Sequence, residues 1–120
     1  MKNKTLVLGA SLNAERYSNK AIKRLVANGV PTLAHGRTAG EVAGISIETE
    51  RVKYSDVDTV TLYLRPSLQA SFETYLLELK PRRVIFNPGT ENSSLETKLN
   101  EHGIETTLAC TLVLLTTKQY

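Results

Sequence analysis

The stretch of residues 4–11, Lys4-Thr5-Leu6-Val7-Leu8-Gly9-Ala10-Ser11, gives the strongest indication of the fold of this chain. Its apolar run is typical of a buried strand, ends in small residues, and is followed from Ser18 by a helical pattern. Glycine lets the backbone come close to a ligand, and the unpaired N–H groups at a helix start attract anions. The turn is not the Gly-x-Gly-x-x-Gly of dinucleotide-binding proteins, so two interpretations stay open, a phosphate-binding turn and a plain strand-to-helix connection.

Length and composition indicate one globular domain over residues 1–120. The chain is 41% hydrophobic and 22% charged, which is ordinary for a soluble protein that can bury a core. Cys110 is the single cysteine and cannot form an internal disulfide, which favours a reducing compartment. No apolar run approaches the roughly 18 residues of a membrane span, and we see no signal-peptide core. We therefore expect a cytoplasmic protein that does not bind a membrane.

The charge is distributed unevenly along the chain. Residues 1–37 carry seven Lys and Arg against Glu15 alone, a balance of +6, whereas residues 38–120 have a balance of −3. This asymmetry favours a local anion site over a surface that binds nucleic acid. Few aromatic residues accompany the basic ones, so we expect no nucleic-acid partner.

Apolar runs predict five main strands. They are residues 6–9, 30–35, 59–64, 84–86 and 104–108. Residues 36–44 are expected to form a loop, and residues 45–47 a short extra strand. The segment 111–115 fits either a final strand or a short helix.

Helical patterns alternate with these strands. The first helix is expected to start at Ser18 as N-cap, to carry Ile22, Leu25 and Val26 on one face, and to end at Asn28-Gly29. A second helix follows Pro66 and ends before Pro81; its apolar positions are Leu68, Phe72, Tyr75, Leu76 and Leu79. A third helix is expected to begin with a capping box of Ser93 and Glu96 and to close at Gly103, with Leu95 and Leu99 facing inward.

This alternation predicts an α/β fold of the Rossmann-like, doubly wound type. We expect a parallel five-stranded sheet with helices on both faces and, with strands numbered along the chain, the order 3-2-1-4-5. Ligands in such sheets bind at the carboxyl ends of the strands, here between the first and fourth strands. Gly9-Ala10-Ser11 and Asn87-Pro88-Gly89-Thr90 should then be neighbours.

Four stretches resemble a known family. KTLVLGASLNAERYSNKAIKRLVANG, VDTVTLYLRP, LKPRRVIFNPGTEN and ACTLVLL occur in order over nearly the whole chain. Together they resemble the small stand-alone CoA-binding proteins related to the nucleotide-binding domain of succinyl-CoA ligase α subunits. The resemblance implies a single Rossmann-type domain that binds CoA or an acyl-CoA, often with no known reaction. This chain departs from the family at Ala14, where relatives have Pro, and at His35-Gly36-Arg37, where they have Asn-Pro.

Candidate CoA-binding residues cluster at the expected strand ends. They are Gly9, Ala10, Ser11, Asn13, Arg16, Tyr17, Ser18, Asn19 and Lys20 after the first strand, His35 and Arg37 after the second, Arg65 after the third, and Asn87, Pro88, Gly89 and Thr90 after the fourth. A bound diphosphate would favour Arg16 and Lys20 at a helix start, where the helix dipole otherwise disfavours cations. Arg37 suits the 3′-phosphate on the ribose of CoA. Surface placement of the cations, N-capping by Ser18 and a ligand-free Pro-Gly turn are the alternatives.

The sequence offers no recognisable catalytic residues. It has no metal-ligand spacing and no Gly-x-Ser-x-Gly elbow, and His102 suits a helix C-terminus. Cys110 is either a packing residue or a thiol near the pantetheine end of CoA. We therefore expect CoA binding without catalysis and no metal site. The alternatives are an NAD(P)-dependent oxidoreductase and a CoA-sensing regulatory subunit, and a protein partner or homodimer is left open.

Overall fold

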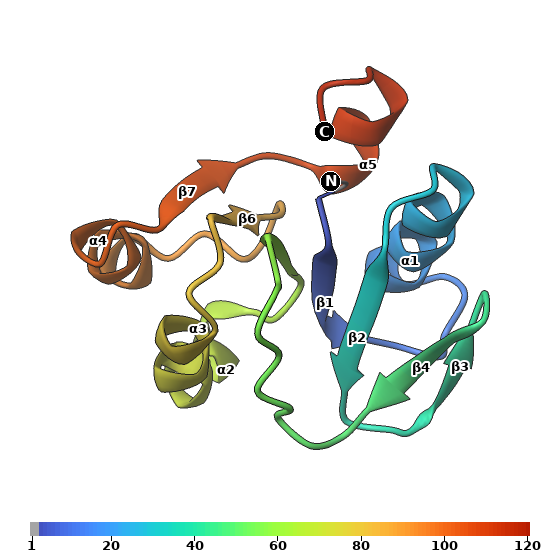
Figure 1. The fold of residues 1–120 in the computed structure, drawn as a ribbon, viewed down its shortest axis with the longest axis horizontal. Coiled ribbons are helices and arrows are strands. Elements are labelled where there is room, and N and C mark those ends of the chain that lie inside the picture. Colours follow the sequence, from blue (N-terminus) through green and yellow to red (C-terminus); the bar gives the residue numbers. More distant parts are fainter. Residues whose placement is uncertain (1–2) are drawn as a thin grey trace.

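One mixed sheet of seven strands forms the centre of the protein in the computed structural model, which describes residues 3–120 (Figure 1). The strands are β1 (Thr5–Ala10), β2 (Thr32–Gly36), β3 (Gly40–Val42), β4 (Ile45–Glu48), β5 (Thr59–Leu62), β6 (Arg83–Phe86) and β7 (Glu105–Leu108). Their order in the sheet is β3-β4-β2-β1-β5-β6-β7. Every neighbouring pair is parallel except β3 and β4, which are antiparallel.

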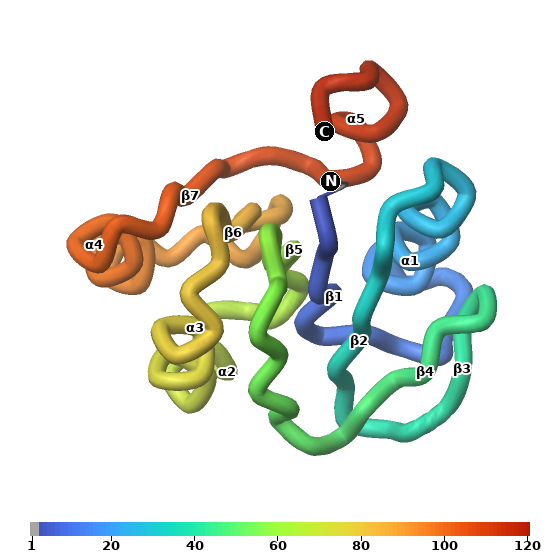
Figure 2. Tube along the Cα trace, in the orientation of Figure 1, coloured from blue at the N-terminus to red at the C-terminus, as the bar shows by residue number. Residues whose placement is uncertain are grey.

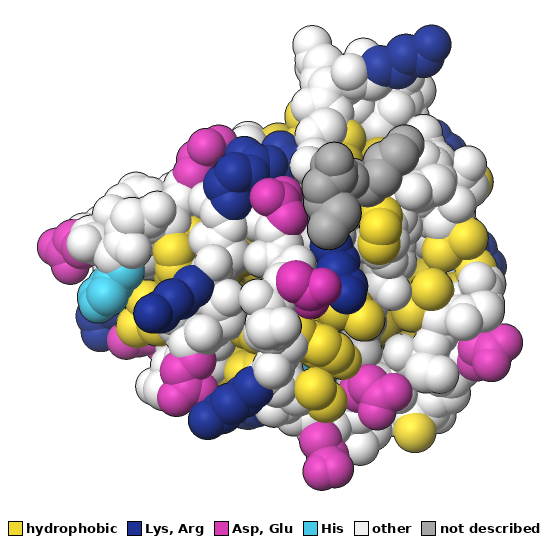
Figure 3. Space-filling view, viewed as in Figure 1, with side chains coloured by type: hydrophobic (Ala, Val, Ile, Leu, Met, Phe, Trp, Pro, Cys, Tyr) yellow, Lys and Arg dark blue, Asp and Glu magenta, His cyan; other side chains and the backbone are white. Residues whose placement is uncertain are grey.

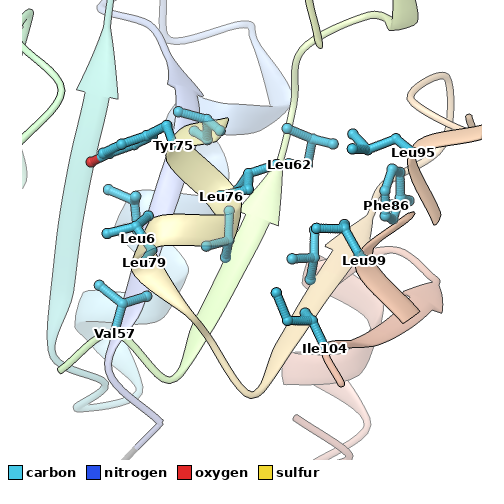
Figure 4. Close-up of a cluster of buried hydrophobic side chains, with 13 residues drawn as sticks. Leu6, Val57, Leu62, Tyr75, Leu76, Leu79, Phe86, Leu95, Leu99 and Ile104 are labelled. Atoms are coloured by element: carbon cyan, nitrogen blue, oxygen red, sulfur yellow. The ribbon is translucent and has the colours of Figure 1, made fainter. Parts of the chain in front are cut away.

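Helices cover both faces of this sheet, as expected. They are α1 (Tyr17–Ala27), α2 (Pro66–Gln69), the 3-10 helix η1 (Ala70–Phe72), α3 (Glu73–Leu79), α4 (Ser93–Glu101) and α5 (Thr111–Thr116). Alternate residues of β1 point to opposite faces. Leu6 and Leu8 pack with α3 and α4, while Val7 packs with α1 and α5. Figure 4 shows Leu76 and Leu99 meeting the strand side chains on the first of these faces.

The expected order 3-2-1-4-5 and the expected count of five strands are both wrong. Residues 40–48 form a hairpin instead of a loop and one short strand, because Ala43 and Gly44 adopt the two positive φ angles of a tight turn, 52° and 82°. This hairpin pairs with the outer side of β2 through β4. The outer side of β2 is therefore occupied, and β5, which was expected there, lies between β1 and β6.

Several helix boundaries also differ from the expectation. The helix after Pro66 is divided into α2, η1 and α3, and buried Gln69 anchors its first turn by donating to the carbonyls of Leu64 at 2.7 Å and Thr90 at 2.8 Å. Helix α4 is capped by Asn92, one residue before the expected Ser93. The ambiguous segment 111–115 is helical.

The two ends of the described chain lie side by side (Figure 2). The side-chain amide of Asn3 donates to the Tyr120 carbonyl at 3.1 Å, and the buried Arg83 donates to the same oxygen at 3.0 Å. The Arg83 guanidinium also lies 4.6 Å from the Tyr120 ring centre, and the Tyr120 hydroxyl is hydrogen-bonded to Thr5. In residues 3–120, no helix is long and apolar enough to span a bilayer.

Candidate functional site

The turn after β1 is pressed against the end of β5. Gly9 has φ +100°, and a Cβ there would lie 3.0 Å from the Tyr63 carbonyl carbon and 3.3 Å from the Leu64 nitrogen. Tyr63 also donates its N–H to Leu8 at 2.8 Å, which holds the two strand exits together. Only glycine satisfies both the positive φ and the close approach. Gly9 therefore holds the carboxyl end of β1 close to the end of β5.

Short-range hydrogen bonds fix the shape of the turn that follows. The hydroxyl of Ser11 accepts from the Asn13 N–H at 3.1 Å, and the Asn13 side chain accepts from the Glu15 N–H at 2.9 Å. The side-chain amide of Asn19 donates back to the Ser11 carbonyl at 2.9 Å. These bonds hold residues 11–15 against the first turns of α1 without using a ligand.

The start of α1 leaves backbone donors open. Helix α1 begins at Tyr17 with Arg16 in the N-cap position, so the expected N-cap Ser18 is wrong; Ser18 lies buried inside the first turn. No side chain caps the helix, and within residues 3–120 the N–H groups of Tyr17 and Ser18 have no acceptor. Free N–H groups together with the positive end of the helix dipole form an anion-binding position.

Two cations near this helix start form no ion pair, although Glu15 directly precedes one of them. Arg16 and Lys20 are exposed, α1 has no acidic residue, and neither cation has an ion-pair partner among the described residues. Lys20 Nζ lies 5.3 Å from the ring centre of the exposed Tyr17. By contrast, acidic and basic side chains are interspersed on the face in Figure 3. Lys2, which contributes to the basic N-terminal balance, lies outside the described residues.

Asn19 carries a buried oxygen without a partner. Its side chain is only 2% exposed, and the bond from Nδ2 to the Ser11 carbonyl determines which end of the amide is Oδ1. That Oδ1 accepts no hydrogen bond within the described chain. A buried acceptor of this kind is costly unless water or a ligand satisfies it.

The end of β2 brings another backbone close to the turn. At Gly36 a Cβ would lie 2.4 Å from the Ala10 carbonyl oxygen, so only glycine fits between the two strand exits. Arg37 follows directly and is exposed. His35, in contrast, is buried: its Nδ1 is bonded to the Glu50 carbonyl at 3.0 Å. Burial lowers the pKa of His35, and the nearby charge of Arg51 lowers it further, although the Glu50 bond opposes this.

The turn after β6 does not adjoin the turn after β1, because β5 lies between them. Asn87 is 1% exposed and its amide is fully used: it donates to Thr61 and Leu62 and accepts from the Thr111 N–H at 2.9 Å. The Thr90 hydroxyl is also buried and donates to the Asn87 carbonyl at 2.7 Å. Of this predicted group only Pro88 and Gly89 are exposed. The amide of Asn87 therefore ties β5, β6 and α5 together.

Near the β5 exit lie Tyr63, which the sequence did not indicate, and Arg65, which it did. Tyr63 is half-buried, and its hydroxyl has no hydrogen-bond partner in residues 3–120. Burial raises its pKa to about 12. Arg65 is exposed, precedes α2 and donates from Nε to the Ser67 hydroxyl at 3.0 Å. Cys110 is half-buried at the N-cap position of α5.

These features together suit the binding of an anionic ligand at the carboxyl end of β1. The order in which strands are added to the sheet reverses at β1. Strands β2 and β4 extend the sheet on one side of β1, and strands β5 to β7 extend it on the other. Crevices at such reversals are the usual ligand sites of open α/β sheets. In the part of the chain that the structure describes, no cluster of His, Cys, Asp and Glu could hold a metal ion.

Comparison with solved structures finds the same fold in several proteins. A crystal structure of an uncharacterized protein is 48% identical, with 100% of this chain and 99% of that chain covered and a TM-score of 0.97. A hypothetical protein from Pyrococcus horikoshii OT3 is 23% identical, with 93% and 80% covered and a TM-score of 0.83. The dinucleotide forming acetyl-coenzyme A synthetase 1 of Ca. Korarchaeum cryptofilum is 14% identical, with 88% of this chain and 25% of that chain covered and a TM-score of 0.70. The last two likenesses concern the fold alone.

The family assignment follows from the sequence profile. No curated protein matches the chain significantly. The profile of the CoA binding domain family, however, matches residues 3–116, which is nearly the full length. The resemblance stated from the four sequence stretches is thereby confirmed, and this chain belongs to the CoA binding domain family.

Proposed function

We propose that this protein binds CoA or an acyl-CoA, with the diphosphate at the start of α1. The observation that carries the proposal is the uncapped helix start, where the free N–H groups of Tyr17 and Ser18 lie beside the unpaired cations Arg16 and Lys20. A diphosphate accepts hydrogen bonds and carries negative charge, so it complements both features. Membership of the CoA binding domain family supports CoA as the ligand.

The ribose 3′-phosphate is assigned to Arg37 in this proposal. Arg37 directly follows β2, which neighbours β1, and adjacent strands lie about 4.8 Å apart. An exposed guanidinium one strand away from the diphosphate position suits a phosphate on the adjoining ribose. The proposed function is binding as such: no side chain is assigned a catalytic role.

Calorimetric titration with CoA, acetyl-CoA, NAD and NADP tests the proposal. We expect CoA and acetyl-CoA to bind, NAD and NADP to bind more weakly, and CoA affinity to fall as salt screens the exposed cations. The double variant Ser11→Asp, Lys20→Glu should lose CoA binding while the fold, checked by circular dichroism, is retained. Unchanged CoA affinity in a folded double variant would refute this location, and tighter NAD binding would favour an oxidoreductase instead.

Arg37→Ala separates the two phosphate positions. Loss of a charge-assisted hydrogen bond costs about 1.5–3 kcal/mol, so CoA should bind about tenfold or more weakly. Dephospho-CoA lacks the 3′-phosphate and should bind the variant and the wild type alike. Equal weakening of both ligands would remove Arg37 from this role.

A further inference from the structure

We propose that Arg51 is the platform on which the adenine ring of CoA stacks, an inference that rests on the proposed function. Arg51 lies in residues 49–58, which connect β4 to β5 without a helix or strand. It belongs to neither the phosphate-binding turn nor the strand ends that the sequence indicates. Its assignment comes from the way its guanidinium is held.

The guanidinium of Arg51 lies over an aromatic ring and is held there by hydrogen bonds. Its central carbon lies 3.8 Å from the ring centre of Phe72. One terminal nitrogen donates to the Ser71 carbonyl, and the other donates to the Ser71 hydroxyl at 3.3 Å. Ordering a flexible side chain on binding costs free energy. Because these contacts already restrict the Arg51 side chain, stacking with a ligand would not incur that cost again.

The support beneath Arg51 is itself anchored. Phe72 meets the buried His35 ring edge-on at a centroid distance of 5.5 Å, and Tyr75 lies 6.4 Å from both rings. His35 is bonded to the Glu50 carbonyl at 3.0 Å, and the Tyr75 hydroxyl donates to the Val52 carbonyl at 2.6 Å. The residues before and after Arg51 are thus both tied to the aromatic cluster.

The charge and exposure of Arg51 leave it available to a ligand. Arg51 is exposed, and it has no acidic partner among residues 3–120. In this proposal Phe72 covers one face of the guanidinium and the ligand stacks on the other. Both terminal nitrogens are already engaged by Ser71, which favours stacking on this open face over two-pronged phosphate binding.

The position of Arg51 matches the far end of the adenosine. It follows the end of β4 by three residues, and β4 is separated from β1 by β2 alone. Two strand spacings amount to about 10 Å across the sheet from β1, which leads to the diphosphate position, to β4, which leads to Arg51. The ribose occupies the interval, and Arg37 at the end of β2 stands between the two. In this arrangement the diphosphate lies near the end of β1, the ribose phosphate near the end of β2, and the adenine base near the end of β4.

Arg51→Ala tests this assignment against Lys53→Ala, a matched loss of an exposed cation two residues away. Titrations use CoA, dephospho-CoA and 4′-phosphopantetheine, which lacks the nucleoside. We expect Arg51→Ala to weaken CoA and dephospho-CoA equally, by about five- to tenfold, and to leave 4′-phosphopantetheine unchanged. Lys53→Ala should alter none of the three. Arg51→Lys, which keeps the charge without the planar group, should lose nearly as much affinity as Arg51→Ala and serves if the alanine variant does not fold.

Three outcomes would overturn the assignment while leaving the proposed function intact. They are unchanged CoA affinity in Arg51→Ala, equal weakening of 4′-phosphopantetheine, and full recovery in Arg51→Lys. Wild-type protein that binds none of the three ligands would instead refute the proposed function itself, and the platform with it.

Discussion

Helices α1 and α4 both follow parallel strands at the same edge of the sheet, yet only α4 has a side chain that caps the N–H groups of its first turn. At α4 the Asn92 side chain accepts from the Leu95 N–H at 3.2 Å, and the Glu96 carboxylate accepts from the Asn92 N–H at 3.2 Å. At α1 the N-cap position is occupied by Arg16, which makes no capping bond, and no acid occurs in the first turn.

In the proposed function, this contrast separates a helix start that is stabilised by its own chain from one that an external anion stabilises. A side-chain cap contributes about 1 kcal/mol, and α4 obtains it from its own chain. Helix α1 forgoes that contribution and instead places cations where the dipole disfavours them. An arrangement that is unfavourable without a ligand becomes favourable when a diphosphate binds.

The largest expected effect comes from Gly9, which brings the α1 turn against β5. Gly9→Ala should destabilise the fold by about 3 kcal/mol, because a Cβ would meet Tyr63 backbone at a strained φ. Gly103→Ala, after α4, is the matched control: φ is +79° but nothing lies within 4 Å, so we expect about 1 kcal/mol. Urea denaturation measures both. Equal losses would show that the close approach at Gly9 contributes nothing.

Arg16→Asp gives α1 the kind of cap that α4 has. The carboxylate can accept from the free Ser18 N–H, so the ligand-free protein should gain about 1 kcal/mol in stability. CoA affinity should fall by about tenfold or more, because a negative charge then occupies the diphosphate position. Thermal unfolding and calorimetry provide the two readouts. A variant that gains stability and keeps full CoA affinity would contradict the proposed division of roles.

Asn92→Ala removes the cap that α4 does have. We expect a loss of about 1 kcal/mol in the free energy of unfolding and unchanged CoA affinity, since this helix start holds no ligand in the proposal. Asn92 also donates to buried Gln69 at 2.9 Å, so Asn92→Ser, which retains a cap but loses that bond, is the matched control. A marked fall in CoA affinity in Asn92→Ala would place the α4 start in the ligand site.

The smallest expected effect is the pH dependence contributed by His35. Its pKa is lowered from 6.5, chiefly by burial, so the unfolded chain takes up the proton more readily than the folded one. The stability that neutral His35 contributes is present above pH 6.5 and is lost as the pH falls through the native pKa. His35→Gln should flatten urea-midpoint profiles between pH 7 and 5, relative to His102→Gln at the exposed end of α4. Identical profiles for the two variants would contradict this origin.

The sequence predicted the local elements well where one pattern dominates. Apolar runs located the five main strands, and the spacing of Ile22 and Leu25 located α1. Both of these side chains are fully buried. Val26 was expected on the same face but is 37% exposed, because α1 buries only a narrow stripe. Asn28 and Gly29 end the helix as expected, with Gly29 at φ +72°.

The strand order could not be predicted because it depends on a hairpin with a weak local pattern. Strand β3 is three residues long and mostly exposed, so no apolar run marks it. Once β4 occupies the outer side of β2, the position of β5 follows, and with it the separation of Asn87 from Gly9. The pairing of β4 with β2 therefore determines that Asn87 lies away from Gly9, and the sequence of neither strand alone indicates this pairing.

The candidate site was predictable in its backbone and less so in its side chains. Gly9 and Ser11 were recognised from a strand that ends in small residues. Tyr63 and Arg51 were missed, since neither belongs to a motif and both depend on contacts between distant segments. Asn87 was expected at the ligand because it follows a strand, but its amide is satisfied by three hydrogen bonds with β5 and α5.

The meeting of Asn3 and Tyr120 makes the described chain nearly a closed loop. A short glycine linker can therefore join Asn3 and Tyr120, and new chain ends can be created at the exposed Ala43-Gly44 turn. Because Asn3 precedes β1 and contacts Tyr120, the junction lies at the opposite edge of the sheet from the turn after Gly9. The described chain is thus suited to circular permutation, and reporter domains attached near Asn3 and Tyr120 would lie at the edge of the sheet opposite the proposed ligand site.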